Sequence, residues 1–385
     1  MNALGIYVHI PFCKSKCYYC DFCSAPASDS IKSSYTDCLA AEITAERSRE
    51  FLRNYLVDSI FFGGGTPTCL SQDALCYLLK CLYSAYNVSS NAEITIECNP
   101  GTVDHTALKA LKSEGFNRIS FGLQSAHDKE LAALGRIHDF KIFDKSYNDA
   151  RHAGFDNINI DLMYGIPLQT EESFERTLEQ VVSYAPEHIS AYSLKIEPDT
   201  PFYEKRDVLV LPDEDSEYNM YTAATKHLLQ SGYQHYEISN YALSGKRSRH
   251  NLKYWSCDDY IGFGLAAHSC IGLKRYENTS SMAEYLSCFE NSHDPSYSYV
   301  SEEESPSLSE FAEEYIMMRL RLSDGLSIET FNNRFDMDFE KKYLQRIIPF
   351  INSGYIIFDH TRKCISLTDA GMYVSNYILS EILDL

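Results

Sequence analysis

Short apolar runs alternate with longer amphipathic segments along the first half of the chain. Six runs rich in β-branched and aromatic residues have the length of strands, and they lie at residues 5–10, 58–62, 93–98, 118–121, 157–163 and 188–194. Between them, helical spacing of apolar residues is found at residues 31–55, 71–86, 104–113, 141–152 and 171–183. Ser71 and Thr170 stand where N-caps are expected. This α/β alternation predicts parallel strands with right-handed crossovers, in an open sheet or a barrel.

Residues of unusual type gather directly after each predicted strand. The segments, in chain order, are HIPFCKSKCYYC, GGGTPT, ECNPGT, GLQS, DLMYGIP and LKIEP. Any one of them would suit an ordinary turn, because glycine and proline are common turn residues. In a barrel, however, the C-terminal ends of parallel strands converge on one mouth. The coincidence of six such segments predicts a single ligand site there.

The pattern changes after the sixth strand. Residues 198–220 are acidic and punctuated by proline, which is typical of a domain edge or a lid. We expect three parts: a barrel at residues 1–200, an α+β extension at 201–300, and a small helical domain like a winged helix at 301–385. Residues 301–385 carry 15 acidic and eight basic side chains, so DNA binding is disfavoured there.

Composition narrows the class of protein. The 385 residues are 44% hydrophobic and 23% charged, which excludes wholesale disorder. A net charge of -20 opposes sequence-independent binding to nucleic-acid phosphates. The sequence has no apolar run of about 18 residues and no signal peptide at its start, so we expect a cytoplasmic protein.

Thirteen cysteines are present, and four of them fall within eleven residues. An odd number without an export signal argues against a disulfide framework. Cys13, Cys17 and Cys20 form a C-x3-C-x2-C motif, a spacing that suits an iron-sulfur cluster, whereas zinc more often shows two separated pairs. Three thiolates leave one iron of a four-iron cluster open to a small chelating molecule. A fourth thiolate from Cys23 would close it, and we expect Cys23 to be inert.

These motifs resemble the radical S-adenosylmethionine (SAM) proteins. The segments YVHIPFCKSKCYYCDF, FFGGGTPT, IECNP, SFGLQS, NIDLMYGIPLQT and ISAYSLKIEPDT are similar to the oxygen-independent coproporphyrinogen III dehydrogenases and the related HemW heme chaperones. The resemblance runs through essentially the whole chain. It implies a partial (β/α)6 radical SAM barrel followed by an α+β segment and a small C-terminal winged-helix-like domain.

The resemblance also implies the cofactors. Cys13, Cys17 and Cys20 are expected to hold a [4Fe-4S] cluster whose open iron is chelated by the amino and carboxylate groups of SAM. Such a cluster can pass one electron to the sulfonium and release a 5'-deoxyadenosyl radical, chemistry that belongs to the cofactor. No protein residue is assigned a catalytic role.

Nine residues match SAM contacts of the family: Tyr7, Tyr19, Gly64, Gly65, Thr66, Glu97, Gln124, Arg136 and Asp161. Glycine has no Cβ, so the glycines with neighbouring Gly63 permit close approach of the amino group. Glu97 matches a carboxylate that binds a ribose hydroxyl. Gln124, Arg136 and Asp161 match residues that contact a second SAM in the dehydrogenases. Asp161 ends an apolar strand, where a carboxylate needs a polar partner.

Three features favour the chaperones over the dehydrogenases. The dehydrogenase motif continues C-x3-C-x2-C-x-C, but Phe22 stands at the fourth cysteine position. The dehydrogenases carry a substantial N-terminal extension, whereas only six residues precede Tyr7 here. The segment HNLKYW, residues 250–255, matches the HNxxYW motif of the HemW proteins.

By this motif His250 is expected to bind heme, and imidazole is a strong axial ligand for heme iron. Lys246, Arg247 and Arg249 lie directly upstream and either pair with heme propionates or form a solvated basic turn. His268 is a second candidate ligand, or else a core residue.

Two functions from different classes follow. The first is a heme chaperone that holds SAM, a cluster and heme, and passes heme to a client protein such as a respiratory oxidase. The alternative is an enzyme that oxidatively decarboxylates coproporphyrinogen III. We expect heme or porphyrin and a heme-accepting client as partners, and no nucleic acid. Peripheral membrane association, the choice between monomer and dimer, and covalent attachment of heme stay open.

Overall fold

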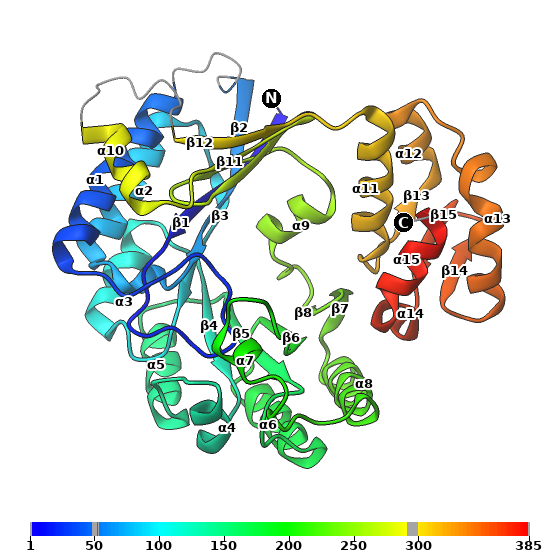
Figure 1. The fold of residues 1–385 in the computed structure, drawn as a ribbon, viewed down its shortest axis with the longest axis horizontal. Coiled ribbons are helices and arrows are strands. Elements are labelled where there is room, and N and C mark those ends of the chain that lie inside the picture. The colour runs from blue at the N-terminus through cyan, green and yellow to red at the C-terminus, as the bar shows by residue number, and fades with distance from the viewer. Residues whose placement is uncertain (1, 48–51, 53, 291–298, 384–385) are drawn as a thin grey trace.

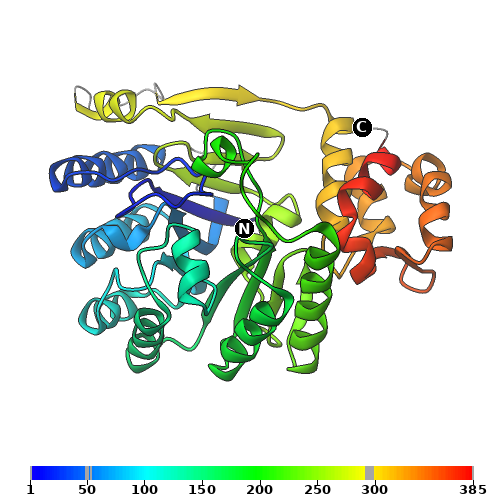
Figure 2. The ribbon, with the colours of Figure 1, turned by 60° about the horizontal axis from the view of Figure 1, so that its bottom comes forward.

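A curved sheet of twelve strands forms the body of the protein in the computed structural model, which describes residues 2–47, 52, 54–290 and 299–383. The strand order is β12-β11-β10-β9-β1-β2-β3-β4-β5-β6-β8-β7. Strands β1 to β6 pair in parallel and in chain order, with helices packed on their outer face (Figures 1 and 2). The predicted parallel barrel is confirmed in its partial form.

All six predicted strands are present in the sheet. Their bounds are β1 Asn2–Ile10, β2 Tyr55–Gly64, β3 Val88–Cys98, β4 Arg118–Gln124, β5 Ile158–Tyr164 and β6 His188–Ser193. The intervening helices are α1 Asp29–Glu46, α2 Gln72–Ala85, α3 His105–Glu114, α4 Asp128–Ala133, α5 Phe140–His152 and α6 Glu171–Ser183. Ser71 and Thr170 cap α2 and α6 as predicted.

The main differences from the prediction are the end of one helix and one additional helix. The helix expected over residues 31–55 ends at Glu46, and Tyr55 already pairs with Asn2 in the sheet. Tyr55 therefore belongs to the next strand, and period alone does not separate the two elements. Residues 48–51 and 53 of the predicted span lie outside the described residues. The short helix α4 was not predicted, because its six residues are too few to show a helical period.

Side chains on the barrel strands alternate between an apolar outer face and a polar inner one. Buried outward residues on adjacent strands include Ile60, Ile94, Ile96, Ile119 and Ile160, which belong to one core with the surrounding helices. The inward residues form a polar layer that runs across the sheet, since Glu97 pairs with Ser120, Gly122 with Asp161, and Asp161 with Ser190. Because successive residues of a strand point to opposite faces, this alternation fixes the register.

Residues between 201 and 304 extend both edges of the same sheet. Strands β7 Gln234–Glu237 and β8 Asn240–Ala242 continue beyond β6, and β9 Tyr260–Phe263 pairs in parallel with β1. Beyond β9 follow β10 His268–Ile271, β11 Lys274–Asn278 and β12 Val300–Glu304. The helices of this part are α7 Pro201–Glu204, α8 Glu214–Gln230, α9 Arg249–Trp255 and α10 Met282–Glu290. The acidic stretch at 198–220 thus contains α7 and the start of α8.

Helix α9 lies within the concave side of the sheet (Figure 1). A Cβ placed on Gly5 of β1 would lie 2.7 Å from the Lys253 side chain and 3.3 Å from the His250 ring. This close approach requires glycine at position 5 and seats the HNxxYW segment against β1.

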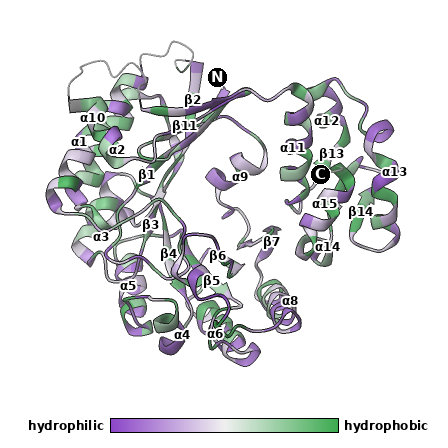
Figure 3. Ribbon diagram, viewed as in Figure 1, coloured by the Kyte–Doolittle hydropathy of each residue, from purple (hydrophilic) through white to green (hydrophobic). Residues whose placement is uncertain are grey.

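The C-terminal region has its own apolar core. It consists of α11 Leu308–Leu320, β13 Leu326–Ser327, α12 Ile328–Phe335, α13 Phe339–Asn352, β14 Ile356–Asp359, β15 Cys364–Leu367, α14 Asp369–Tyr373 and α15 Ser375–Leu383. Hydrophilic and hydrophobic residues alternate along these helices, as along those around the barrel (Figure 3). Three helices followed by a hairpin match the predicted order. Within the described residues, none of the helices combines the length and the apolar character needed to cross a bilayer.

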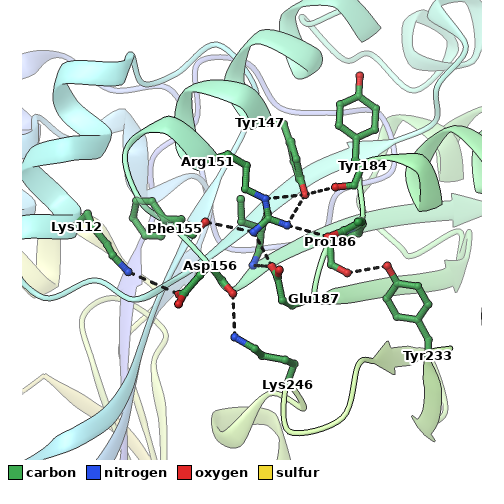
Figure 4. A network of polar contacts seen from close by, with 12 residues as sticks. Lys112, Tyr147, Arg151, Phe155, Asp156, Tyr184, Pro186, Glu187, Tyr233 and Lys246 are labelled. Carbon is green, nitrogen blue, oxygen red and sulfur yellow. Dashed lines mark hydrogen bonds and ion pairs between the residues drawn. The ribbon is translucent and has the colours of Figure 1, made fainter. Parts of the chain in front are cut away.

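A polar network closes the barrel at the N-terminal ends of β5 and β6 (Figure 4). The Arg151 guanidinium donates to Glu187 Oε2 at 2.8 Å and to the Tyr147 hydroxyl. Lys246 Nζ donates to the Asp156 carbonyl at 2.9 Å in the same region. This end of the barrel is therefore bound together by side chains that are already paired.

Buried Glu42 of α1 connects the barrel to the β9–β11 edge. Its carboxylate accepts hydrogen bonds from the Gly264 N–H at 2.8 Å, the Asn278 amide at 2.8 Å and the Tyr285 hydroxyl. A buried donor that loses its acceptor costs more than a hydrogen bond normally contributes. The side chain thus holds three elements of the extension against the barrel.

We expect Glu42→Ala to lower the free energy of unfolding by at least about 2 kcal/mol, because it leaves three buried donors without an acceptor. Urea denaturation followed by circular dichroism measures the change. The control is Thr44→Ala, an exposed position of the same helix, which should stay within about 0.5 kcal/mol of the unaltered protein. Equal stability of the two variants would contradict this role for Glu42.

Candidate functional site

The C-terminal ends of the barrel strands surround a cavity of about 370 Å³, here called the mouth cavity. Its wall contains Cys17, Tyr19, Cys20, Phe22, Gly64, Gly65, Thr66, Glu97, Cys98, Asn99, Ser120, Gly122, Gln124, Arg136, Asp161, Ser190, Tyr192, Ser239 and Asn240. Most residues proposed from sequence as SAM contacts therefore share one cavity. Three residues predicted for the site do not line it: Tyr7, Cys13 and His250.

The cysteines lie on a loop at residues 11–25, here called the cluster loop, which is anchored at its base and its tip. At the base, Phe12 and Ala25 form a parallel bridge, and the Cys13 N–H donates to the Ala25 carbonyl at 3.2 Å. At the tip, the Tyr18 N–H donates to the Leu134 carbonyl, and the Tyr18 carbonyl accepts from the Phe202 N–H, both at 3.0 Å. The loop is held in place by the backbone independently of any ligand.

Cys13, Cys17 and Cys20 are free, half-buried thiols. Cys17 and Cys20 line the mouth cavity, and Cys13 Sγ lies 3.6 Å from the hydroxyl of Thr66, which also lines it. Among the described residues no three His, Cys, Asp or Glu side chains converge as ligands of a single metal ion. A four-iron cluster places each thiolate on a different iron, so convergence on one point is not needed. Three thiols on one anchored loop fit such a cluster.

Cys23 lies apart from the other three. It does not line the mouth cavity, and its Sγ lies 4.0 Å from the Ser280 carbonyl. Burial raises the pKa of its thiol above the ordinary value, which favours the protonated form.

The glycine segment after β2 is required by the packing of the chain itself. Gly64 has a φ of +109°, and a Cβ on it would lie 2.5 Å from the His9 ring. A Cβ on Gly65 would lie 2.8 Å from the Phe12 carbonyl oxygen. The absence of side chains thus lets the strand end, His9 and the cluster loop come together beside the cavity.

Two carboxyl groups, Glu97 and Asp161, face the mouth cavity from β3 and β5. Burial, together with nearby Asp161, raises the pKa of Glu97 to about 8, and its Oε2 accepts from the Gly64 N–H at 3.1 Å. Burial also raises the pKa of Asp161. Asp161 accepts from Ser120 Oγ at 3.1 Å and from the Asn159 amide at 2.6 Å, so the expected polar partner is confirmed.

Arg136 and Gln124 complete the polar wall. Arg136 donates to Asn99 Oδ1 at 2.8 Å, while its buried Nε has no hydrogen-bond partner among the described residues. Gln124 accepts from the Tyr192 hydroxyl at 2.9 Å and has a φ of +74°, a strained conformation for a residue with a side chain. Asn240 Oδ1 is also buried without a partner in the described part of the chain. An unpaired donor and an unpaired acceptor in one wall fit a polar ligand.

Tyr7 lines a second cavity of about 490 Å³, here called the tyrosine cavity, which lies beside the cluster loop. Its wall consists of Tyr7, His9, Asp21, Phe22, Cys23, Tyr254, Tyr260, Ala266 and His268. Tyr7 thus lines the neighbouring cavity, and its role as a SAM contact stays a prediction. Phe22 lines both cavities, so they adjoin at the cluster loop.

His250 is 1% exposed and lines neither of these cavities. One ring nitrogen, Nδ1, lies 3.0 Å from Ser59 Oγ, and Nε2 lies 2.8 Å from the Tyr254 hydroxyl. Burial lowers the pKa of His250 to about 3, so the ring is neutral at physiological pH. In this conformation neither ring nitrogen is free to bind heme iron.

The basic run before His250 does not form one anion site. Lys246 binds the Asp156 carbonyl, Arg247 binds the Asp324 carboxylate at 2.8 Å, and Arg249 donates to the Asn91 carbonyl at 2.8 Å. Each cation is bound by a different segment of the chain, and pairing with heme propionates stays a prediction.

Sequence reasoning missed several polar residues of the mouth cavity, among them Asn99, Ser120, Tyr192, Ser239 and Asn240. Asn99 stands within the ECNPGT segment that was noted, and Ser120 pairs with Glu97 in the sheet. Ser239 and Asn240 come from the β7–β8 turn, outside the βα units. The strand-end pattern gave no signal for them.

Comparison with known proteins agrees with this geometry. Residues 7–181 match the radical SAM superfamily, and residues 307–374 match the HemN C-terminal domain. The solved structure of coproporphyrinogen III oxidase (HemN) from Escherichia coli, described as a radical SAM enzyme, superposes with a TM-score of 0.85 at 26% identity, covering 99% of this chain and 90% of the other.

Full-length relatives define the family more closely. The heme chaperone HemW of Lactococcus lactis is 34% identical over 98% of this chain and 96% of its own length. HemW of Bacillus subtilis is 33% identical over 98% of both chains. The sequence motifs, the thiol-bearing loop at the barrel mouth and these full-length matches agree: the chain belongs to the HemW family of the radical SAM superfamily.

Proposed function

We propose that this protein is a heme chaperone that binds a [4Fe-4S] cluster, SAM and heme, and transfers heme to a client protein. The observation that carries the proposal is similarity over nearly the whole chain to proteins named heme chaperone HemW. The chain also has the three cysteines of the cluster loop and the residues that line the mouth cavity. The HNxxYW segment, packed inside the barrel, supports the same assignment.

In this proposal Cys13, Cys17 and Cys20 hold the cluster and the mouth cavity holds SAM. When bound, the cluster supplies electrons at low potential to the sulfonium of SAM. The residues of this chain bind and orient the two cofactors. Arg136 Nε, which has no hydrogen-bond partner among the described residues, is a donor for a carboxylate, and Glu97 is an acceptor for hydroxyl groups. Tyr19 and Tyr192 add aromatic surface to the wall of this cavity.

The second candidate function, oxidative decarboxylation of coproporphyrinogen III, is favoured by one observation, the overall similarity to HemN. Phe22 at the fourth cysteine position of the dehydrogenase motif, and the HNxxYW segment, support the chaperone instead.

The remaining partner assignments are also proposals. We propose a cytoplasmic protein whose client is a heme-dependent respiratory enzyme and which does not bind nucleic acid. The thirteen cysteines all lie in the described part of the chain, and no disulfide is found among them, which supports a reducing compartment. The net charge of -20 supports the absence of a nucleic-acid partner.

Cys23→Ala is expected to retain the full iron and sulfide content after anaerobic reconstitution, because Cys23 faces the tyrosine cavity and not the mouth cavity. Cys17→Ala provides the matched comparison on the same loop and should lose the cluster. Iron and sulfide analysis with the visible spectrum measures both. A Cys23→Ala protein without a cluster would show that Cys23 is a ligand.

Glu97→Gln is expected to weaken SAM binding by roughly tenfold at pH 9, because it removes a charge-assisted hydrogen bond worth about 1.5 kcal/mol or more. The pKa of Glu97 is about 8 without ligand, so the carboxyl becomes neutral as the pH falls below that value. The difference between Glu97→Gln and the unaltered protein should therefore shrink between pH 9 and pH 6.5.

Equilibrium dialysis with labelled SAM measures this affinity. Glu175→Gln, an exposed substitution on α6, is the control and should match the unaltered protein at each pH. A difference for Glu97→Gln that does not change with pH would contradict the role of its ionisation.

The reconstituted protein is expected to bind heme and to deliver it to the apo form of a heme-dependent respiratory enzyme, with no conversion of coproporphyrinogen III. Incubation with SAM, dithionite and coproporphyrinogen III, followed by chromatography of the oxidised porphyrins, tests the alternative. Protoporphyrin formation would overturn the chaperone assignment. So would the absence of heme binding in an anaerobic titration.

A further inference from the structure

The tyrosine cavity adjoins the mouth cavity at the cluster loop, and Phe22 lines both. Phe22, Tyr7, Tyr254 and Tyr260 give it aromatic walls, and the rings of Tyr254 and Tyr260 are perpendicular at 4.7 Å. Its volume of about 490 Å³ lies within the range of cavities that enclose small organic ligands. Aromatic walls of this kind suit the flat apolar face of a porphyrin.

Two histidines line the tyrosine cavity, and they differ in availability. His9 is 6% exposed; its Nδ1 lies 3.1 Å from the Tyr7 hydroxyl and its Nε2 lies 3.0 Å from the Cys23 carbonyl. The side chain of His268, on β10, is 65% exposed, and its nearest charged neighbour is Glu277 Oε1 at 3.9 Å. Among the described residues that line the cavity, His268 alone offers an imidazole without a hydrogen-bonded nitrogen.

His268 faces one carboxylate across the sheet. Glu277 stands directly opposite it on β11 in the antiparallel pairing, with its Oε1 3.9 Å from His268 Nε2, which is beyond hydrogen-bond distance. The imidazole therefore keeps both nitrogens available to a metal ion. The other nucleophile of the cavity, Cys23, is a weaker competitor, because burial favours its protonated thiol.

His250 contributes to this cavity indirectly. Its Nε2 lies within hydrogen-bonding distance of the Tyr254 hydroxyl, and its ring stacks near that of Tyr7 at 6.4 Å. Tyr254 and Tyr7 are both wall residues. A change at His250 therefore moves two aromatic walls without removing a ligand.

Resting on the proposed heme chaperone function, we propose that heme binds in the tyrosine cavity, with the His268 imidazole as its axial ligand and His250 as a positioning residue behind the wall. This places heme directly beside the cluster loop, with Phe22 between the heme and the mouth cavity. It also explains how an HNxxYW histidine with both nitrogens engaged can matter for heme binding.

The test is an anaerobic titration of the cluster-loaded, full-length protein with hemin, followed by absorption and electron paramagnetic resonance spectra. We expect His268→Ala to weaken heme binding about tenfold or more and to lose the imidazole-ligated spectrum, which added imidazole should restore. His250→Gln should weaken binding but keep the ligated spectrum. His152→Ala, an exposed substitution on α5, should match the unaltered protein.

The possible outcomes distinguish failure of the proposed heme site from failure of the proposed chaperone function. If the unaltered protein binds heme while His268→Ala keeps its affinity and spectrum, the site is overturned and the chaperone function stands. The same holds if His250→Gln alone loses the imidazole signal, or if Cys23→Ala removes a thiolate signal. If the unaltered protein binds no heme, the proposed function fails, and the site with it. Iron content and the thermal unfolding midpoint of each variant show that loss of binding is not loss of fold.

Discussion

A polar layer inside a sheet that is apolar outside is the constraint on which the rest of this structure depends. Each barrel strand presents Ile, Phe or Leu to the helices and a polar residue to the interior, so that Glu97, Ser120, Asp161 and Ser190 lie side by side across four strands. Burial opposes this arrangement, and the raised pKa of Glu97 is the direct sign of its cost. Neighbouring hydroxyls, amides and backbone N–H groups offset that cost, and unsatisfied atoms such as Arg136 Nε remain for a ligand.

The extension completes the partial barrel in two different ways. On one edge, the β7–β8 turn brings Ser239 and Asn240 into the mouth cavity beside β6. On the other edge, β9 and β10 form the outer wall of the tyrosine cavity beside β1. Each cavity therefore includes residues from outside the six βα units. The hydrogen bonds of buried Glu42 connect the second edge of the sheet to the barrel.

Much of this was predictable from sequence. The strands followed from their apolar runs, and the strand-end rule brought Cys17, Gly65, Glu97 and Asp161 to one cavity because parallel strands all end at the same face. The rule could not place residues that follow no barrel strand, such as Asn240. It also could not show that Tyr7, although on β1, faces a different cavity, because that depends on where β9 pairs.

His250 shows a different limit of sequence reasoning. A motif identifies a residue that matters, but it does not say whether the side chain touches the ligand or supports a residue that does. Burial and hydrogen bonding make that distinction. The His250 ring is 1% exposed with both nitrogens in hydrogen-bond contact, which suits a residue that supports its neighbours. The His268 ring is largely exposed at a cavity, which suits a residue that binds a ligand. Since Phe22 lines both cavities and the Cys23 carbonyl is held by His9, any ligand that shifts the cluster loop alters the walls of both. The two cavities therefore share one loop, and Phe22 is a wall residue of both.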